Sequence, residues 1–309
     1  MDKNTFYGHG KLLLTAEYFV LDGAKALALP TQLGQHLRLQ NLSGSNNLLY
    51  WVALNNKRQP WLKTVLDKRD FSCVGTADDA TMRLSRALSF CRNLNPAFLN
   101  NNNDVAVETQ LEFPNEWGLG SSSTFIYCLA AWAQVNAYEL LEKTLGGSGY
   151  DVACAGAHKP ILYQRNEFSP IMEEVNWNPV FKHHIYFAYQ GKKKLSSEAI
   201  THYKNNMRNK GATIQALNKI TKQVLSCATL SEFEQLLMAH EEIIAKSLSL
   251  PKVKEERFVD FNGAVKSLGA WGGDFVLLTH TGPRETLATY LRSKNIDTLL
   301  NWDEMILSL

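Results

Sequence analysis

The sequence predicts an α+β fold in two parts, and three observations support this prediction. Short apolar runs interrupted by Gly and Pro fill the N-terminal region, as is typical of strands. Apolar residues recur at helical spacing over residues 78–94 and 231–250. The first half reads as strands followed by a helix, and a well-marked helix and an apolar strand follow in the second half. A chain of 309 residues with 45% hydrophobic content can bury one large core or two ordinary ones. The proline-containing segment 166–181 favours a boundary near residue 170, so we expect domains over residues 1–170 and 171–309.

The first elements are expected to be strands. Residues 11–31 are typical of a strand, a turn around Asp22 and Gly23, and a second strand, which together predict a hairpin. The segment HLRLQNL, residues 36–42, alternates polar and apolar side chains, and residues 46–54 are apolar enough for a further strand.

A loop rich in Gly and Ser follows the alternating segment 105–113. It reads PNEWGLGSSS and leads into an apolar run. Glycines at 118 and 120 let the backbone approach a ligand, and residues 121–123 fall where the first turn of a helix has unpaired N–H groups. These donors and the helix dipole attract phosphate, and serine hydroxyls can bind phosphate oxygens or Mg²⁺. The pattern predicts an anion site, and the alternative is an ordinary serine N-cap after a glycine turn.

The C-terminal half combines strands, one well-marked helix and two more glycine-rich segments. The first of these, GGSGYDVACAG, covers residues 146–156, and residues 184–190 then predict a strand. A helix over 231–250 is expected to open with a capping box formed by Ser231 and Glu234. The segment GAVKSLGAWGGDFVLLT, residues 263–279, places a glycine-rich loop before an apolar strand.

Composition and motif spacing exclude several classes of protein. With 32 basic and 30 acidic residues, the chain lacks the broad basic field of a nucleic-acid binder. No window reaches membrane-spanning length, so we expect a cytoplasmic protein. The Walker A spacing fails at Lys11, because Thr5 and Leu12 occupy the positions that need Gly and Ser or Thr. No GxGxxG opens a helix in the context of a dinucleotide site.

Three motifs in order resemble those of the GHMP kinases, the family of galactokinase, homoserine kinase, mevalonate kinase and phosphomevalonate kinase. They are the lysine-led N-terminal strand with Glu17, the loop PNEWGLGSSS and the loop GAWGGDF. The resemblance covers nearly the whole chain. The N-terminus and GSGYDVA are most similar to mevalonate and phosphomevalonate kinases, and GSGYDVA also resembles a bacterial subgroup with a Gly-Tyr-Asp-Ile-Ala motif.

This resemblance implies a fold and a set of site residues. The fold would be an N-terminal domain of the ribosomal S5 type and a C-terminal ferredoxin-like domain, with ATP between them. Asp151 would be the catalytic base, Lys11 its ion-pair partner, and Ser122 a Mg²⁺ ligand. Without the family, Asp151 is equally a helix N-cap and Lys11 a surface lysine. The loop that wraps the ATP phosphates would consist of Gly118, Leu119, Gly120, Ser121, Ser122 and Ser123.

Other positions would support the site, and some depart from the family pattern. The supporting residues implied are Glu17, Ser148, Gly149, Gly269, Gly272 and Gly273. Leu140 stands where mevalonate kinases carry a second Mg²⁺-binding Glu, with Glu139 and Glu142 nearby. Trp271 replaces a small residue. The run 192–194 (KKK) is either a solvated loop or a site for a phosphate already on the substrate.

The resemblance therefore implies an ATP- and Mg²⁺-dependent kinase that phosphorylates mevalonate or phosphomevalonate in isoprenoid-precursor synthesis. Two alternatives remain open: a family member acting on a sugar or amino-acid hydroxyl, and a nucleotide-binding protein without turnover. We expect a small-molecule substrate, no nucleic-acid or membrane partner, and a monomer or homodimer.

Overall fold

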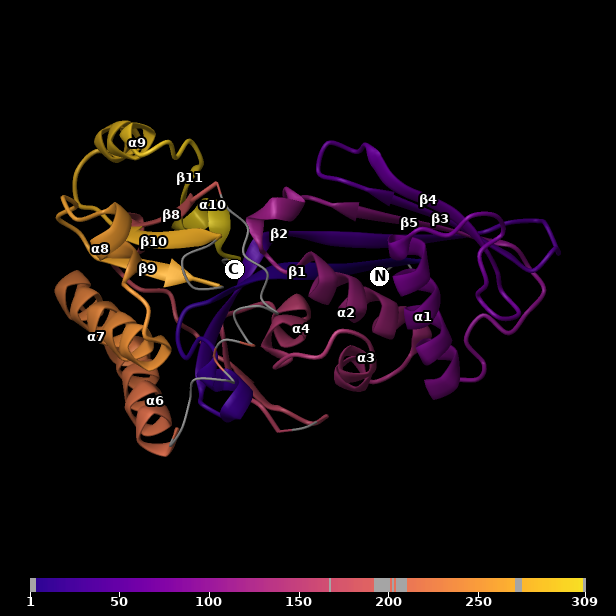
Figure 1. The fold of residues 1–309 in the computed structure, drawn as a ribbon, viewed down its shortest axis with the longest axis horizontal. Coiled ribbons are helices and arrows are strands. Elements are labelled where there is room, and N and C mark those ends of the chain that lie inside the picture. Colours follow the sequence, from indigo (N-terminus) through magenta and orange to yellow (C-terminus); the bar gives the residue numbers. More distant parts are fainter. Residues whose placement is uncertain are drawn as a thin grey trace.

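The computed structural model describes residues 4–166, 168–191, 201, 203, 210–269 and 274–307. These residues form two sheets, each with its own helices (Figure 1). The larger sheet has seven strands in the order β4-β3-β5-β2-β6-β7, with β1 pairing with β2. The smaller sheet has four strands in the order β11-β8-β10-β9. The α+β prediction is confirmed.

The larger sheet is covered on one face by four helices (Figure 1). Its strands are β1 (Thr5–Leu13), β2 (Ala26–Asn41), β3 (Leu48–Leu54), β4 (Pro60–Asp67), β5 (Val105–Leu111), β6 (Ile161–Gln164) and β7 (Ile171–Glu174). The helices are α1 (Asp79–Leu94), α2 (Ser121–Ala133), α3 (Ala137–Thr144) and α4 (Tyr150–Ala155). Leu84, Leu88, Leu129 and Val107 are among the buried residues that pack between these layers.

The smaller sheet is antiparallel throughout. Its strands are β8 (Ile185–Tyr189), β9 (Val265–Leu268), β10 (Phe275–Thr279) and β11 (Leu299–Asn301). Its helices are α6 (Gly211–Ser226), α7 (Leu230–Leu248), α8 (Val253–Arg257), α9 (Arg284–Ser293) and α10 (Trp302–Met305). The succession of strand, helices, two strands, helix and strand is that of a ferredoxin-like domain, as expected.

The two sheets share a core. Leu12 and Leu29 of the larger sheet pack in one buried cluster with Phe187 and Phe275 of the smaller sheet. The end of the chain returns to the larger sheet, where Leu307 N–H donates to the Pro30 carbonyl oxygen at 3.0 Å. The division after residue 170 stays a prediction, with β7 the last strand of the larger sheet. Within the described ranges, no helix is both long and apolar enough to cross a bilayer.

The structure corrects three sequence-based expectations. The first strand ends at Leu13, and the apolar residues after it form a loop and a short 3₁₀ helix, η1 (Phe19–Asp22). The two strands predicted over the second half of 11–31 and over 36–42 form one long strand, β2. The capping box of α7 uses Thr229 and Glu232 in place of Ser231 and Glu234.

Candidate active site

Two glycines in the loop before α2 adopt backbone conformations that favour glycine. Gly118 and Gly120 have φ of 67° and 89°, in the left-handed region that favours glycine. A methyl group on Gly118 would overlap the carboxylate of Asp274, and one on Gly120 would lie 3.2 Å from Lys11 Cγ. Gly118 is therefore favoured by both backbone conformation and space, and Gly120 mainly by its backbone conformation.

The first turn of α2 presents free donors beside this loop. The N–H groups of Ser123 and Thr124 both donate to the Gly120 carbonyl oxygen at 3.0 Å. Within the described part of the chain, the N–H groups of Ser121 and Ser122 have no such partner. The Ser121 hydroxyl donates to Asn115 Oδ1 at 2.9 Å, whereas the Ser122 side chain is exposed. Two backbone donors and one hydroxyl are thus available to an anion at a helix N-terminus.

Asp151 is brought to the same place by α4. It lies in the first turn of that helix, directly after Gly149 and Tyr150, and is partly exposed. Its Oδ2 accepts a hydrogen bond from Ser123 Oγ at 2.5 Å, and its Oδ1 accepts from the Val152 N–H at 3.1 Å. The Ser123 hydroxyl therefore orients the carboxylate and ties α4 to the first turn of α2.

Lys11 reaches this loop from a break in the β1–β2 ladder. The register shifts between His9 and Lys11, so the Lys11 N–H leaves the ladder and donates to the Leu119 carbonyl oxygen at 3.0 Å. Its ammonium nitrogen donates to the Gly118 carbonyl oxygen at 2.9 Å and lies 5.8 Å from the centre of the Tyr150 ring.

The expected ion pair between Lys11 and Asp151 is not formed, because the lysine binds the loop instead. The charges of Lys11 and Asp151 nevertheless both influence the pKa of the Cys154 thiol. Burial raises the pKa of the Cys154 thiol, Asp151 raises it further and Lys11 lowers it. Both charges therefore lie near one face of α4.

Glu17 lies below the surface of this site. It is 2% exposed, in the loop between β1 and η1, and pairs with Lys266 of β9. Burial raises the pKa of this carboxyl, although Lys266 opposes the shift. Its place in the interior fits a supporting residue and leaves it no surface for a substrate.

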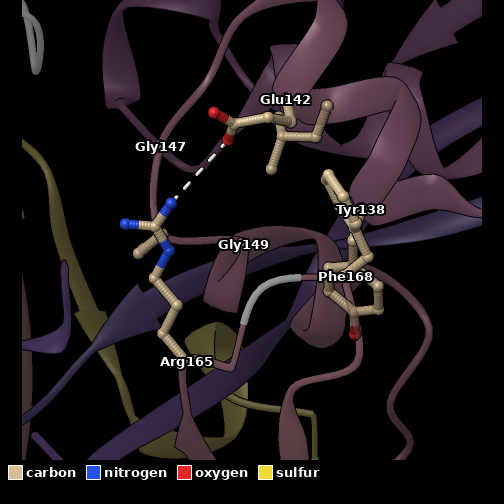
Figure 2. Close-up of a pocket in the computed structure, with 8 residues that line it drawn as sticks. Tyr138, Glu142, Gly147, Gly149, Arg165 and Phe168 are labelled. Carbon is tan, nitrogen blue, oxygen red and sulfur yellow. Dashed lines mark ion pairs between the residues drawn. The ribbon is translucent and has the colours of Figure 1, made fainter. Parts of the chain in front are cut away.

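Ser148 and Gly149 precede Asp151 and line a cavity of about 290 Å³ (Figure 2). The Tyr163 hydroxyl donates to the Ser148 carbonyl oxygen at 2.5 Å and so fixes this segment. Glu142 and Arg165 face each other across the cavity at 3.7 Å (Figure 2). The remaining lining residues are Tyr138, Leu141, Gly147 and Phe168.

The position expected for a second metal ligand is apolar and buried. Leu140 is fully buried among the α1–α3 side chains, and Glu142 is paired with Arg165. In the described ranges, no group of three or more His, Cys, Asp or Glu side chains is arranged to hold a metal ion. Gly269 is described, with φ of 79°. The remaining expectations, on Gly272, Gly273, Trp271 and residues 192–194, lie outside the described residues.

Three residues near the site were not singled out from the sequence. Asp274 ends the GAWGGD segment and lies against Gly118 and Gly269. Tyr150 lies over Lys11. Lys266 is a charged residue that lies between Val265 and Leu268 in a short strand, as Glu17 lies within an apolar run, and such positions can indicate a buried ion pair.

Comparison with known proteins places the fold but not the substrate. No protein-family model and no curated protein matches the chain. Solved structures match over nearly its whole length. The Methanococcus jannaschii mevalonate kinase is 16% identical with a TM-score of 0.69, and the match covers 99% of this chain and 98% of that one.

Two further kinases match to a similar extent. Streptococcus pneumoniae phosphomevalonate kinase, in complex with phosphomevalonate and AMPPNP, is 14% identical with a TM-score of 0.72, covering 96% of this chain and 99% of that one. Lactococcus lactis galactokinase, in complex with galactose, is 13% identical with a TM-score of 0.66, covering 94% and 88%. The chain has the fold of the GHMP kinases.

Proposed function

We propose that this chain is an ATP- and Mg²⁺-dependent kinase that phosphorylates mevalonate or phosphomevalonate in isoprenoid-precursor synthesis. The observation that carries the proposal is the bond from Ser123 to Asp151, because it holds a carboxylate at the N-terminus of α2, where phosphates bind. The similar Streptococcus pneumoniae enzyme supports it, since that protein was solved with an ATP analogue and phosphomevalonate.

The residues present fit the phosphates of ATP. Gly118 and Gly120 adopt the left-handed conformations that carry the loop into α2, and the N–H groups of Ser121 and Ser122 supply donors. Mg²⁺ commonly binds substrate phosphates with one or two protein ligands. Ser122 would serve as such a ligand because its side chain is exposed beside the free donors. The ion would neutralise charge on the phosphates.

The protein side chains then have few tasks, because phosphoryl transfer depends mainly on positioning and electrostatics. With mevalonate, Asp151, oriented by Ser123, accepts the proton of the attacking hydroxyl. With phosphomevalonate the attacking group is a phosphate oxygen, and Asp151 accepts any proton that this oxygen still carries. Lys11, held on the loop through Gly118, places a positive charge beside the transferred group.

A sugar hydroxyl is the second candidate acceptor. The match to Lactococcus lactis galactokinase supports it, because its TM-score of 0.66 is close to the 0.69 and 0.72 of the mevalonate-pathway enzymes.

The test is coupled ADP release with Mg²⁺ and ATP, offering mevalonate, phosphomevalonate, homoserine and galactose separately. Asp151→Asn serves as the control, and binding of AMPPNP is measured in parallel. Release with mevalonate or phosphomevalonate, lost in the variant, supports the proposal and identifies the acceptor, whereas release only with galactose or homoserine favours a sugar or amino-acid acceptor. Binding of AMPPNP without release for any acceptor favours a nucleotide-binding protein without turnover. Absence of both overturns the proposal.

A further inference from the structure

Four ionisable side chains meet in the interior between the two sheets. They are Glu17, His240, Glu241 and Lys266, here called the buried cluster, and each is at most 2% exposed. Glu17 comes from the loop after β1, His240 and Glu241 from α7, and Lys266 from β9. The cluster therefore joins the N-terminal strand to the strand that leads into the glycine-rich segment at Gly269.

Lys266 is the centre of the cluster. Its ammonium nitrogen donates a short hydrogen bond to Glu17 Oε1 and further bonds to the Ser267 carbonyl oxygen at 3.1 Å and Glu241 Oε1 at 3.4 Å. The lysine is thus shared between two carboxylates, with the closer contact to Glu17.

His240 adds no positive charge. Its Nε2 accepts a hydrogen bond from the Ala16 N–H at 2.8 Å, which makes the ring neutral with its hydrogen on Nδ1. Burial lowers the pKa of His240 well below its usual range, and Lys266 lowers it further. Glu17 Oε2 lies 3.2 Å from the same nitrogen.

Charge counting then requires one more proton in the cluster. One ammonium faces two carboxylates, and a net charge left in the interior carries a large desolvation cost. Burial raises the pKa of both carboxyls, and we assign the proton to Glu241 because Glu17 holds the closer contact to the lysine. In agreement, the pKa of Glu241 is raised to about 7. Burial is the main cause, Lys266 lowers this pKa, and Glu17 raises it. The remaining group facing it is the Ser267 N–H.

Two chains of contacts connect the buried cluster to Gly118 in the proposed phosphate loop. Along one chain of contacts, Glu17 follows β1, whose Lys11 donates to the Gly118 carbonyl oxygen. Along the other, Lys266 lies in β9, which leads to Gly269, and Asp274 lies between Gly269 and Gly118. Both chains of contacts therefore start at the buried cluster and meet at Gly118.

We propose that Lys266 is a positioning residue of the nucleotide site: with Glu17 and a protonated Glu241, it clamps β9 to the loop after β1 and so keeps Lys11 and Asp274 in place on Gly118. Loss of the Glu241 proton divides Lys266 between two charged carboxylates and loosens the clamp. The inference rests on the proposed function only for the identity of the ligand.

The first test measures the dissociation constant of AMPPNP with Mg²⁺ by calorimetry, from about pH 6 to about pH 8, on either side of the Glu241 pKa. The proteins are wild type, Glu241→Gln and Glu242→Gln. Glu242 is the matched control, because it is the next residue of α7 but is only partly buried and pairs with Lys246 and Lys252.

The ratio of wild-type to Glu241→Gln dissociation constants removes the titration of AMPPNP itself. We expect this ratio to rise by roughly fivefold or more with pH, the lower end of coupling between distinct sites. The ratio of the Glu242→Gln dissociation constant to the Glu241→Gln dissociation constant should rise with pH by the same factor. A ratio that stays constant with pH overturns the inference, whereas a merely structural role would lower stability without a pH-dependent change in binding.

The second test does not need a nucleotide. Hydrogen exchange is compared between wild type and Lys266→Met for peptides covering residues 14–18 and 265–269. We expect faster exchange in both peptides of a variant that keeps its circular dichroism, and unchanged exchange overturns the clamp. If Lys266→Met does not fold, Glu241→Gln at about pH 8 should show slower exchange than wild type in the same peptides. If wild type binds no AMPPNP, the proposed function fails while this test still decides on the clamp.

Discussion

The free energy of unfolding should depend on pH through Glu241. Its pKa is raised from 4.5 to about 7 in the folded protein, chiefly by burial. Below 4.5, the residue is protonated in both states and has no effect on stability. As the pH rises toward 7, the unfolded chain releases this proton while the folded chain keeps it, so stability falls, and the loss is complete above the folded pKa.

The size of the effect follows from the shift. One pKa unit corresponds to ~1.36 kcal/mol, and the side chain is only 2% exposed, so solvent screening reduces the effect little. Glu241→Gln cannot ionise. We therefore expect its free energy of unfolding, relative to wild type, to rise by about 3 kcal/mol between about pH 4.5 and about pH 8.

Guanidinium denaturation followed by circular dichroism at steps of one pH unit measures this difference. Glu242→Gln is again the control. Lys252 and then Lys246 lower the pKa of Glu242, so its removal should cost stability at high pH, the opposite direction. A difference between Glu241→Gln and wild type that stays constant over this range would show that Glu241 is ionised in the folded protein, and the charge count of the buried cluster would be wrong.

Three further predictions concern the nucleotide site. Asp151→Asn should leave AMPPNP affinity within a few-fold and lower turnover by roughly 10² to 10⁴, the usual effect of a positioned base; unchanged turnover would remove Asp151 from the mechanism. Ser122→Ala should raise the Mg²⁺ concentration needed for half-maximal ADP release, and an unchanged titration would contradict its role as a ligand. Gly118→Ala places an alanine in a left-handed backbone conformation and puts its methyl group against Asp274. We therefore expect weaker AMPPNP binding by calorimetry and a loss of ~1–3 kcal/mol in the free energy of unfolding. Wild-type affinity and stability would contradict this account of the loop.

Local sequence patterns predicted many of the elements well. The helix expected over 78–94 forms from Asp79 to Leu94, with Asp78 as its N-cap. The helix after the glycines starts at Ser121. Both depend on interactions between neighbours in the sequence, which is why a pattern can identify them.

Other features depend on partners that are distant in sequence. Ala16 and Tyr18 have positive φ, and this loop replaces the second half of the predicted first strand because Ala16 N–H and Glu17 have partners on α7 and β9. The strand β4 was missed, since Pro60 and Lys63 interrupt its apolar pattern and it forms by pairing with β3.

The candidate site was predicted in its parts but not in its connections. The glycine-rich loop, Asp151 and Lys11 were each identified from motifs. That Ser123 donates to Asp151, and that Lys11 donates to Gly118, follows from how α2, α4 and β1 pack. A sequence carries no local signal for such contacts.

The pairing of Glu17 with Lys266 also bears on how the chain is made. The two residues are 249 positions apart, and a ribosome that adds ~5–20 residues per second needs tens of seconds to make that stretch. During this interval the nascent N-terminal strands expose Leu12 and Leu29, whose later partners include Phe187 and Phe275, beside a carboxylate with no counter-charge. A chain that stalls before β9 therefore leaves an apolar surface open to chaperones and to aggregation.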